Sequence, residues 1–358
     1  MKRHKDIFNQ IWDYQNLKTA HLNARRGKGW YREVKAVNEN PELFLNALQE
    51  MIKTKTYRTS AYEKFTKTEG KKERVIYKLP YFPDRVCQWA ILQVVEKFLI
   101  KTLTADTYSA IPGRGIHLAL AQLRKTLRKH PDKTTYCLKI DIKKYYPSID
   151  RTILKEKFAK MFKDKDFLWL ISEIIDSSPE PAGIPIGNYV SQYCGNLYLS
   201  DFDHWVKETA GVKFYFRYMD DMLFLSDNKD YLRGLLERAM VFLSDRLKLT
   251  VKDNWQVFPV ATRGIDFVGY RVFPEFSLLR KSICRKFKNR VCSIHQRIDS
   301  GESMTQNDWL SVQSYSGWLG HCDSHRLTEK YVKPLEPFMN EFYEVNIKSK
   351  GGKAHGIC

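Results

Sequence analysis

Apolar residues recur at helical spacing in five stretches of the chain. Three or four positions separate successive apolar side chains there, which is the pattern of a helix that buries one face. Pro83 and Asp84 mark the start of one of these stretches, as residues that favour the first turn of a helix. Helices are predicted over residues 41–56, 84–99, 151–175, 189–207 and 230–247.

Other stretches have the pattern of strands. Residues 74–80 alternate between apolar and polar positions, and the buried-type run 136–141 ends at Asp141 and a turn. Residues 214–226 form two apolar runs around a tight acidic turn, which predicts a hairpin, and 265–273 predict a further strand pair. Strands and hairpins mixed with helices in this order indicate an α+β fold with antiparallel strands.

The charge of the chain narrows the class of partner. Sixty Lys and Arg residues stand against 41 Asp and Glu residues among 358, for a net charge of +19. Such an excess favours nucleic acid or an anionic membrane. No run of 18 apolar residues is present, so nucleic acid is the expected partner. A basic protein that only binds RNA remains an alternative at this point.

The seven cysteines are odd in number and form no Cys-x-x-Cys pair, so we expect no disulfide framework and a reducing, cytoplasmic setting.

Three carboxylates form the strongest chemical signal. Asp220 and Asp221 lie together in the predicted hairpin turn, where a turn would ordinarily prefer Asn-Gly or Asp-Gly. Adjacent like charges repel, so such a turn is usually built around a cation. Asp141 ends the other apolar strand, and if the strands are neighbours the three carboxylates converge on a magnesium site. The alternative is a solvated Asp-Asp turn.

Several motifs, taken in order from about residue 57 to 330, resemble those of reverse transcriptases. Two of them carry the carboxylates, and the others lie before and after them. They are Lys72–Ile76, Asp84–Gln88, Tyr108–Gly115, Asp141–Tyr146, Phe216–Asp221, Phe267–Tyr270 and Ser314–Trp318.

The resemblance implies a right-hand polymerase fold, and it assigns a part of that fold to each segment. The segments are an N-terminal helical extension (1–56), fingers (57–135), palm (136–275, with a helical insertion at about 151–186), a basic helical thumb (276–345) and a tail (346–358).

The resemblance also assigns roles around the carboxylates. It implies that Asp141, Asp220 and Asp221 are catalytic and, with the Ile142 carbonyl, hold two magnesium ions, for which manganese can substitute. It makes Tyr146 a gate whose ring excludes a ribose 2′-hydroxyl, although an ordinary core tyrosine is an alternative.

Basic residues near the fingers motif are expected to bind the triphosphate of the incoming nucleotide, Arg74 above all because guanidinium grips phosphate bidentately. Lys72 is a weaker candidate and Lys71 weaker still. In this family a lysine after the last palm helix is thought to protonate pyrophosphate. Lys252 is nearby, but Asn254-Trp255-Gln256 occupies the usual position, so that role stays open.

Downstream, the resemblance predicts a primer grip and a surface for the template–primer duplex. Phe267, Gly269 and Tyr270 belong to the expected primer grip. Cations of the thumb are expected to contact duplex phosphates. These cations are Arg280, Lys281, Arg285, Lys286, Lys288 and Arg290.

One segment indicates the subfamily. Ile186, Gly187, Ser191 and Gln192 form an I-G-x-x-x-S-Q pattern, where most bacterial relatives have Gln-Gly-x-x-x-Ser-Pro. The pattern resembles reverse transcriptases of diversity-generating retroelements, in bacteria or phages. It implies mutagenic retrohoming, in which a template-repeat RNA is copied from dNTPs into cDNA with frequent errors opposite adenine. The implied partners are that structured RNA, the RNA/cDNA duplex and a small basic pentameric accessory protein.

A physical argument agrees with low fidelity. An apolar Ile186 in place of Gln removes hydrogen bonds that could hold a correct base pair, and each lost polar contact reduces selectivity by about 1–3 kcal/mol. Ile186 as a simple core contact is the alternative. A retron or group II intron-type enzyme and a non-catalytic RNA-binding relative are the competing functions.

Overall fold

The computed structural model describes residues 3–69 and 72–348, and contacts divide the chain into two compact units. The first unit consists of Met1–Gly113, Leu138–Phe224 and Asp230–Gln256, and the second of Arg114–Cys137, Leu225–Lys229 and Val257–Cys358. Lys71 and residues 349–358 of the expected tail lie outside the described residues.

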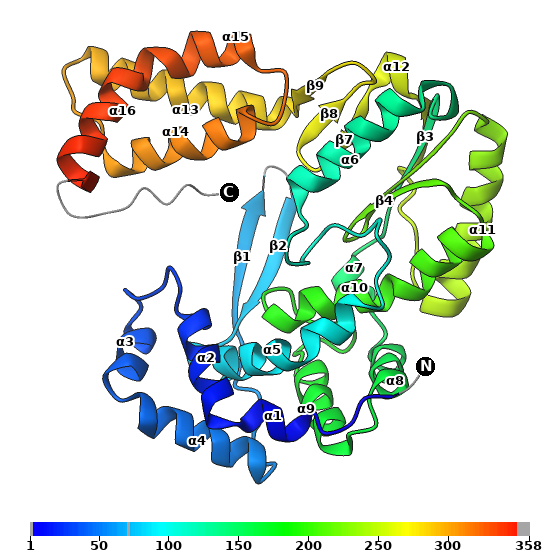
Figure 1. Ribbon diagram of the computed structural model, residues 1–358, viewed down its shortest axis with the longest axis vertical. Coiled ribbons are helices and arrows are strands. Elements are labelled where there is room, and N and C mark those ends of the chain that lie inside the picture. Colours follow the sequence, from blue (N-terminus) through cyan, green and yellow to red (C-terminus); the bar gives the residue numbers. More distant parts are fainter. Residues whose placement is uncertain (1–2, 70–71, 349–358) are drawn as a thin grey trace. The chain divides into compact units, whose positions relative to one another are not determined.

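Four helices open the first unit, and α2 packs on the long helix α5 (Figure 1). The side chain of Asn40 caps α4 by accepting a hydrogen bond from the Leu43 N–H, and Pro41 occupies the first helical position, where a missing N–H costs nothing. Helices α4 and α5 confirm the predicted helices at 41–56 and 84–99. The elements are α1 (Phe8–Trp12), α2 (Tyr14–Ala24), α3 (Arg32–Glu39), α4 (Pro41–Lys53) and α5 (Val86–Ile100).

A two-stranded hairpin lies between α4 and α5. Strands β1 (Glu63–Glu69) and β2 (Lys72–Lys78) pair antiparallel with Glu63 opposite Lys78. Its described side chains are mostly exposed, Phe65 at 44% among them, whereas Tyr77 at its base is buried. The hairpin therefore projects from the unit and is fastened at its base.

The sheet that carries the acidic turn has four strands in the order β4-β5-β3-β6. Strand β3 thus pairs with β5 although the two are far apart in the chain. Their central residues are buried, as the apolar runs predict. The strands are β3 (Tyr136–Asp141), β4 (Phe214–Tyr218), β5 (Asp221–Ser226) and β6 (Gln256–Pro259).

Helix α10 (Tyr189–His204) buries twelve of its sixteen residues, including Asn196 and Asp203. A helix buried on nearly all sides is part of a core rather than a surface. It continues into a π-helical turn, Trp205–Thr209, and α11 (Lys229–Leu247) follows the hairpin β4-β5. Both helices confirm the expected ranges 189–207 and 230–247.

The predicted helical stretch 151–175 consists of two helices, α8 (Arg151–Met161) and α9 (Lys165–Asp176). Asp164 separates them, because its carboxylate caps α9 at Phe167 N and also accepts from the N–H groups of Ile7 and Phe8. The break thus has a local cause, the cap at Phe167, and a distant one, the contacts with the N-terminal segment, and apolar periodicity reports neither.

The second unit contains a three-stranded sheet, β7-β8-β9, and helices that follow it. Helix α13 buries Phe287, Val291 and Ile294 and contacts α14, which begins with a capping box at Thr305 and Asp308. The elements are α6 (Ile116–Lys129), α12 (Val260–Arg263), β7 (Ile265–Phe267), β8 (Tyr270–Val272), β9 (Ser277–Leu279), α13 (Lys281–Asp299), α14 (Gln306–Leu319), α15 (His325–Leu327) and α16 (Glu336–Tyr343).

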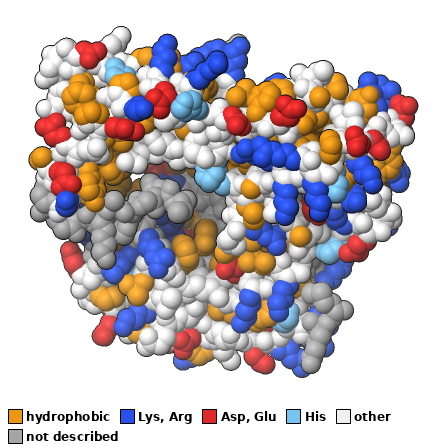
Figure 2. Space-filling model, turned by 45° about the horizontal axis from the view of Figure 1, so that its top comes forward, with side chains coloured by type: hydrophobic (Ala, Val, Ile, Leu, Met, Phe, Trp, Pro, Cys, Tyr) orange, Lys and Arg blue, Asp and Glu red, His pale blue; other side chains and the backbone are white. Residues whose placement is uncertain are grey.

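Lys and Arg side chains are spread over the face shown in Figure 2, with acidic side chains between them. Within residues 3–69 and 72–348, no helix combines the length and the apolar character needed to cross a membrane.

Candidate active site

The acidic turn lies between β4 and β5, and Asp220 is at its tip. Met219, just before it, has a left-handed backbone with φ +53°, a conformation that costs a non-glycine residue free energy. Asp221 already belongs to β5. The turn therefore presents Asp220 from an irregular backbone and Asp221 from a regular strand.

The carboxyl groups of Asp141 and Asp220 are neighbours. Partial burial of Asp220 and the adjacent charge of Asp141 raise the pKa of Asp220 well above its ordinary value of 3.8. The Nζ of Lys252 lies 2.6 Å from Asp141 Oδ1, and the Lys252 N–H donates to the Asp141 carbonyl. Lys252 thus faces the carboxylate pair, whereas its role toward pyrophosphate stays open.

Asp221 has a different partner. Its Oδ2 lies 3.0 Å from Nζ of Lys139, which is two residues before Asp141 on β3. Among the residues that the structure describes, no group of three or more His, Cys, Asp and Glu side chains is arranged to hold a metal ion. The structure therefore brings together two of the three predicted carboxylates, and the role of Asp221 stays a prediction.

The residues present fit a hard divalent cation. Two carboxyl groups that lie together form an all-oxygen donor set, and magnesium prefers such oxygen donors. A cation between them would neutralise their negative charge. The pair Asp141 and Asp220 would hold it, with the carbonyl of Ile142 on the next residue of the chain as a further predicted donor.

Tyr146 lies beside this pair. Its hydroxyl is 3.7 Å from the sulfur of Met219, and burial together with the charge of Asp220 raises its pKa. The preceding Tyr145 is fully buried and donates to the Gly195 carbonyl, so it is the core tyrosine of this pair. Tyr146 is half-buried and its hydroxyl faces Met219 of the acidic turn, and its role as a gate stays a prediction.

The fingers motif lies on β2. Arg74 is exposed and stands opposite Lys67 on β1. Lys72 is the first residue of β2, and its side chain is outside what the structure describes. The triphosphate role of both residues stays a prediction.

The subfamily segment is joined to this hairpin. The Tyr77 N–H on β2 donates to the Ile186 carbonyl at 3.0 Å, and Gly187 follows with φ +127°. Ile186 is half-buried and Gln192 is exposed, whereas Ser191 is buried and its hydroxyl donates to the Pro185 carbonyl. The loop thus fixes the base of the hairpin through its backbone.

Replacing Gly187 by Ala is expected to detach the hairpin from this loop. A Cβ at Gly187 would lie 2.3 Å from the Tyr77 carbonyl oxygen, so the backbones must separate. We expect a loss of about 2 kcal/mol or more in the free energy of unfolding and a higher KM for dNTPs. Urea denaturation and steady-state kinetics measure the two effects.

Gly211→Ala is the matched control for that variant. Gly211 has φ +66°, and no described atom lies within 4 Å of the added Cβ, so the control carries backbone strain without the clash. Equal losses in both variants would contradict the contact argument.

The family of the chain follows from a match to a known protein family. The family described as reverse transcriptase (RNA-dependent DNA polymerase) matches residues 65–272, more than half of the chain and all of the site described above. The chain belongs to the reverse transcriptase family.

Individual relatives are distant. The retron Ec73 reverse transcriptase of Escherichia coli is 24% identical over 262 residues, covering 66% of this chain and 80% of that protein. Protein YkfC of Escherichia coli K12 is 20% identical over 240 residues, covering 56% of this chain and 63% of that protein. The reverse transcriptase described here thus spans less than two thirds of YkfC.

Solved structures agree on the fold. The apo telomerase from Candida tropicalis matches with a TM-score of 0.50 and 13% identity, over 71% of this chain and 51% of that chain. At this identity the likeness concerns the fold alone. The mixed helix-and-sheet architecture is that of a reverse transcriptase, a right-hand polymerase.

The predicted primer grip of this reverse transcriptase lies in the second unit. Phe267 and Tyr270 are fully buried there, and the turn between them, Val268 and Gly269, has positive φ at both positions. A Cβ at Gly269 would lie 2.4 Å from the ring of Trp318, so glycine is required for this packing. Side chains of the grip therefore stabilise the unit. The turn is buried as well, and the Gly269 carbonyl accepts a hydrogen bond from the Arg280 N–H, so contact with a primer stays a prediction.

The predicted duplex-binding cations fall into two groups. Arg280 pairs with Asp266, Arg290 pairs with buried Asp308, and Lys288 lies over the Tyr331 ring. By contrast, three cations in the first turns of α13 are exposed. These are Lys281, Arg285 and Lys286. The second group is the better candidate for phosphate contacts.

Two functional neighbours were not expected from the sequence. Lys139 pairs with Asp221, and Gln88 Oε1 accepts from the N–H groups of Tyr189 and Val190, capping α10 from α5. A charged residue two positions before Asp141 in a buried strand was a signal for Lys139. Gln88 lay in a matching motif, but no local pattern linked it to α10.

Proposed function

We propose that this protein is an RNA-directed DNA polymerase. The proximity of Asp141 and Asp220 at the ends of neighbouring segments of the sheet carries the proposal, because two carboxyl groups that lie together favour a bound cation. Membership of the reverse transcriptase family and the basic surface support it.

Bound magnesium ions would supply charge neutralisation at the primer 3′-hydroxyl and the departing pyrophosphate. The chain's own residues prepare the site for this. Asp141 and Asp220 provide the oxygens, and Lys252 orients Asp141 from 2.6 Å. Tyr146 occupies the space beside Asp220, where a bulkier sugar would be excluded. Arg74 would bind the triphosphate.

For the substrate, we propose a template-repeat RNA that is copied with frequent errors opposite adenine. The I-G-x-x-x-S-Q pattern at Ile186 to Gln192 supports this reading, and the position of Ile186 is consistent with it. Ile186 is half-buried rather than a sealed core residue, and it has no side-chain amide to hold a base pair. The structured RNA and a small basic pentameric protein would be the partners.

A retron-type function is the second candidate. The retron Ec73 reverse transcriptase covers 66% of this chain and is 24% identical. Under this alternative the enzyme copies its own RNA without a bias at adenines.

Sequencing of cDNA separates the two candidates. Purified protein, with and without the proposed accessory protein, is given magnesium, dNTPs and a primed RNA template that contains all four bases in balanced numbers. We expect misincorporation to be concentrated opposite adenine, and Ile186→Gln to reduce it. Error rates that are equal opposite all bases would overturn the diversification proposal and leave the retron reading.

A further inference from the structure

A buried ion pair lies behind the acidic turn. Arg217 on β4 and Asp203 on α10 are both completely buried. The guanidinium grips the carboxylate bidentately, with Nε 2.7 Å from Oδ1 and Nη2 2.6 Å from Oδ2. Burying a charge pair costs desolvation free energy, and apolar residues of similar volume often stabilise a core equally well. Stability alone therefore does not explain this pair.

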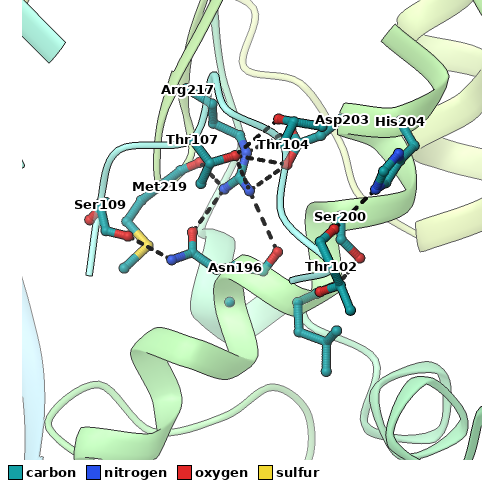
Figure 3. A network of polar contacts seen from close by, with 12 residues as sticks. Thr102, Thr104, Thr107, Ser109, Asn196, Ser200, Asp203, His204, Arg217 and Met219 are labelled. Atoms are coloured by element: carbon teal, nitrogen blue, oxygen red, sulfur yellow. Dashed lines mark hydrogen bonds and ion pairs between the residues drawn. The ribbon is translucent and has the colours of Figure 1, made fainter. Parts of the chain in front are cut away.

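The remaining donor of the guanidinium points to the catalytic turn. Nη1 lies 3.1 Å from the Met219 carbonyl oxygen and 3.1 Å from Asn196 Oδ1 (Figure 3). Met219 is the residue with φ +53° that directly precedes Asp220. Because a strained backbone persists only where its surroundings fix it, this hydrogen bond helps to hold the turn in place.

The same cluster fastens a second segment. The Asn196 amide donates to the Ser109 carbonyl at 2.7 Å, and the Thr107 hydroxyl donates to Asp203 Oδ2. The backbone of Arg217 pairs with this segment as well, since its N–H donates to the Asp106 carbonyl and its carbonyl accepts from Tyr108 N–H. Figure 3 shows Thr107, Ser109 and Asn196 gathered around Arg217. One side chain thus connects α10, the segment 106–109 and the acidic turn.

We propose that Arg217, held by Asp203, is a positioning residue for catalysis. It fixes the Met219 carbonyl and thereby the place of Asp220 relative to Asp141. The proposal rests on the proposed role of Asp220. Arg217 itself is sealed from the site, so it acts through the turn and does not touch the substrate.

Arg217→Lys tests the proposal. A lysine ammonium retains the charge toward Asp203, but it cannot match the planar guanidinium in reaching both carboxylate oxygens, Asn196 and the Met219 carbonyl together. We expect kcat per folded molecule to fall roughly 10–100-fold, the effect of a small misplacement of a reacting group. We expect KM for template–primer to be unchanged and the magnesium concentration for half-maximal rate to rise.

Tyr215→Phe is the matched control. The Tyr215 hydroxyl donates to Asp203 Oδ1 at 2.8 Å, so its loss weakens the same buried cluster at a point away from the turn. We expect a lower melting temperature with unchanged kcat and magnesium dependence. Circular dichroism and active-site titration give the folded fraction of each variant.

Asn196→Ala is a second variant that leaves the Arg217–Asp203 pair in place. It removes one acceptor of Nη1 and the donor to Ser109, so we expect a severalfold loss of kcat and a higher magnesium requirement. If Arg217→Lys does not fold, the kcat and magnesium dependence of Asn196→Ala alone test the proposal. Wild-type kcat and magnesium dependence in the folded variants would overturn the proposal while leaving the polymerase function intact. Absence of DNA synthesis by the wild-type protein would instead refute the proposed function.

Discussion

Replacing Asp220 by Asn is expected to reduce nucleotide incorporation by on the order of 10³-fold, which corresponds to about 4 kcal/mol of lost transition-state stabilisation. The carboxyl group of Asp220 lies beside that of Asp141, and the amide that replaces it has the same shape without the charge. The variant is therefore expected to fold normally and to lose its affinity for a divalent cation. Primer extension under single-turnover conditions measures the rate.

Asp227→Asn is the control, because it removes one exposed carboxylate just after β5. It should retain the wild-type rate. Chelation of divalent cations with EDTA should abolish synthesis by the wild-type protein, and added magnesium should restore it. Synthesis by Asp220→Asn near the wild-type rate would contradict the assignment of the catalytic pair.

Replacing Tyr146 by Ala is expected to let the enzyme incorporate ribonucleotides. The half-buried ring lies beside Asp220 and Met219, and its removal opens space at the place assigned to the sugar. When a pocket rejects a substrate with one additional group, here the 2′-hydroxyl, the discrimination usually amounts to about 1–3 kcal/mol. Without the ring, the preference for dNTP over rNTP should therefore fall roughly 10–200-fold. The ratio of kcat/KM for the two substrates measures it.

Tyr146→Phe separates the ring from the hydroxyl. It keeps the ring and loses the contact between the hydroxyl and the Met219 sulfur. Sugar discrimination should be retained in this variant. If Tyr146→Ala discriminated like the wild type, Tyr146 would be an ordinary core residue and the gate assignment would be wrong.

Local patterns were sufficient for most of the secondary structure. Apolar runs predicted β3 and the hairpin β4-β5, and helical spacing predicted the helices α4, α10 and α11, within a few residues. The division of 151–175 at Asp164 was not predicted. Its carboxylate caps α9 at the Phe167 N–H, which apolar spacing does not report, and it also accepts from the distant N–H groups of Ile7 and Phe8. Periodicity reports how a segment meets the core and contains no information about such distant partners.

The candidate site shows the same division. The sequence by itself determined which residues are candidates for the chemistry, since Asp141 ends one buried strand and Asp220 and Asp221 interrupt another pair. Only the tertiary structure decided which of them meet. Alternation along β3 places Lys139 and Asp141 on the same face, and pairing of β3 with β5 brings Asp221 to Lys139.

Asp220, at the tip of the turn, lies beside Asp141 instead, and the carbonyl of the preceding Met219 accepts a hydrogen bond from Arg217. In the sequence, Arg217 is only a residue of the motif Phe216–Asp221, close to the carboxylates. Its proposed function depends on Asp203 and Asn196, which belong to helix α10, earlier in the sequence. The chemical identity of a side chain is a property of a single residue and can be read from the sequence. Strand register and the partners of a buried charge depend on packing between segments that are far apart in the chain. Only the tertiary structure could therefore supply the register and the partners.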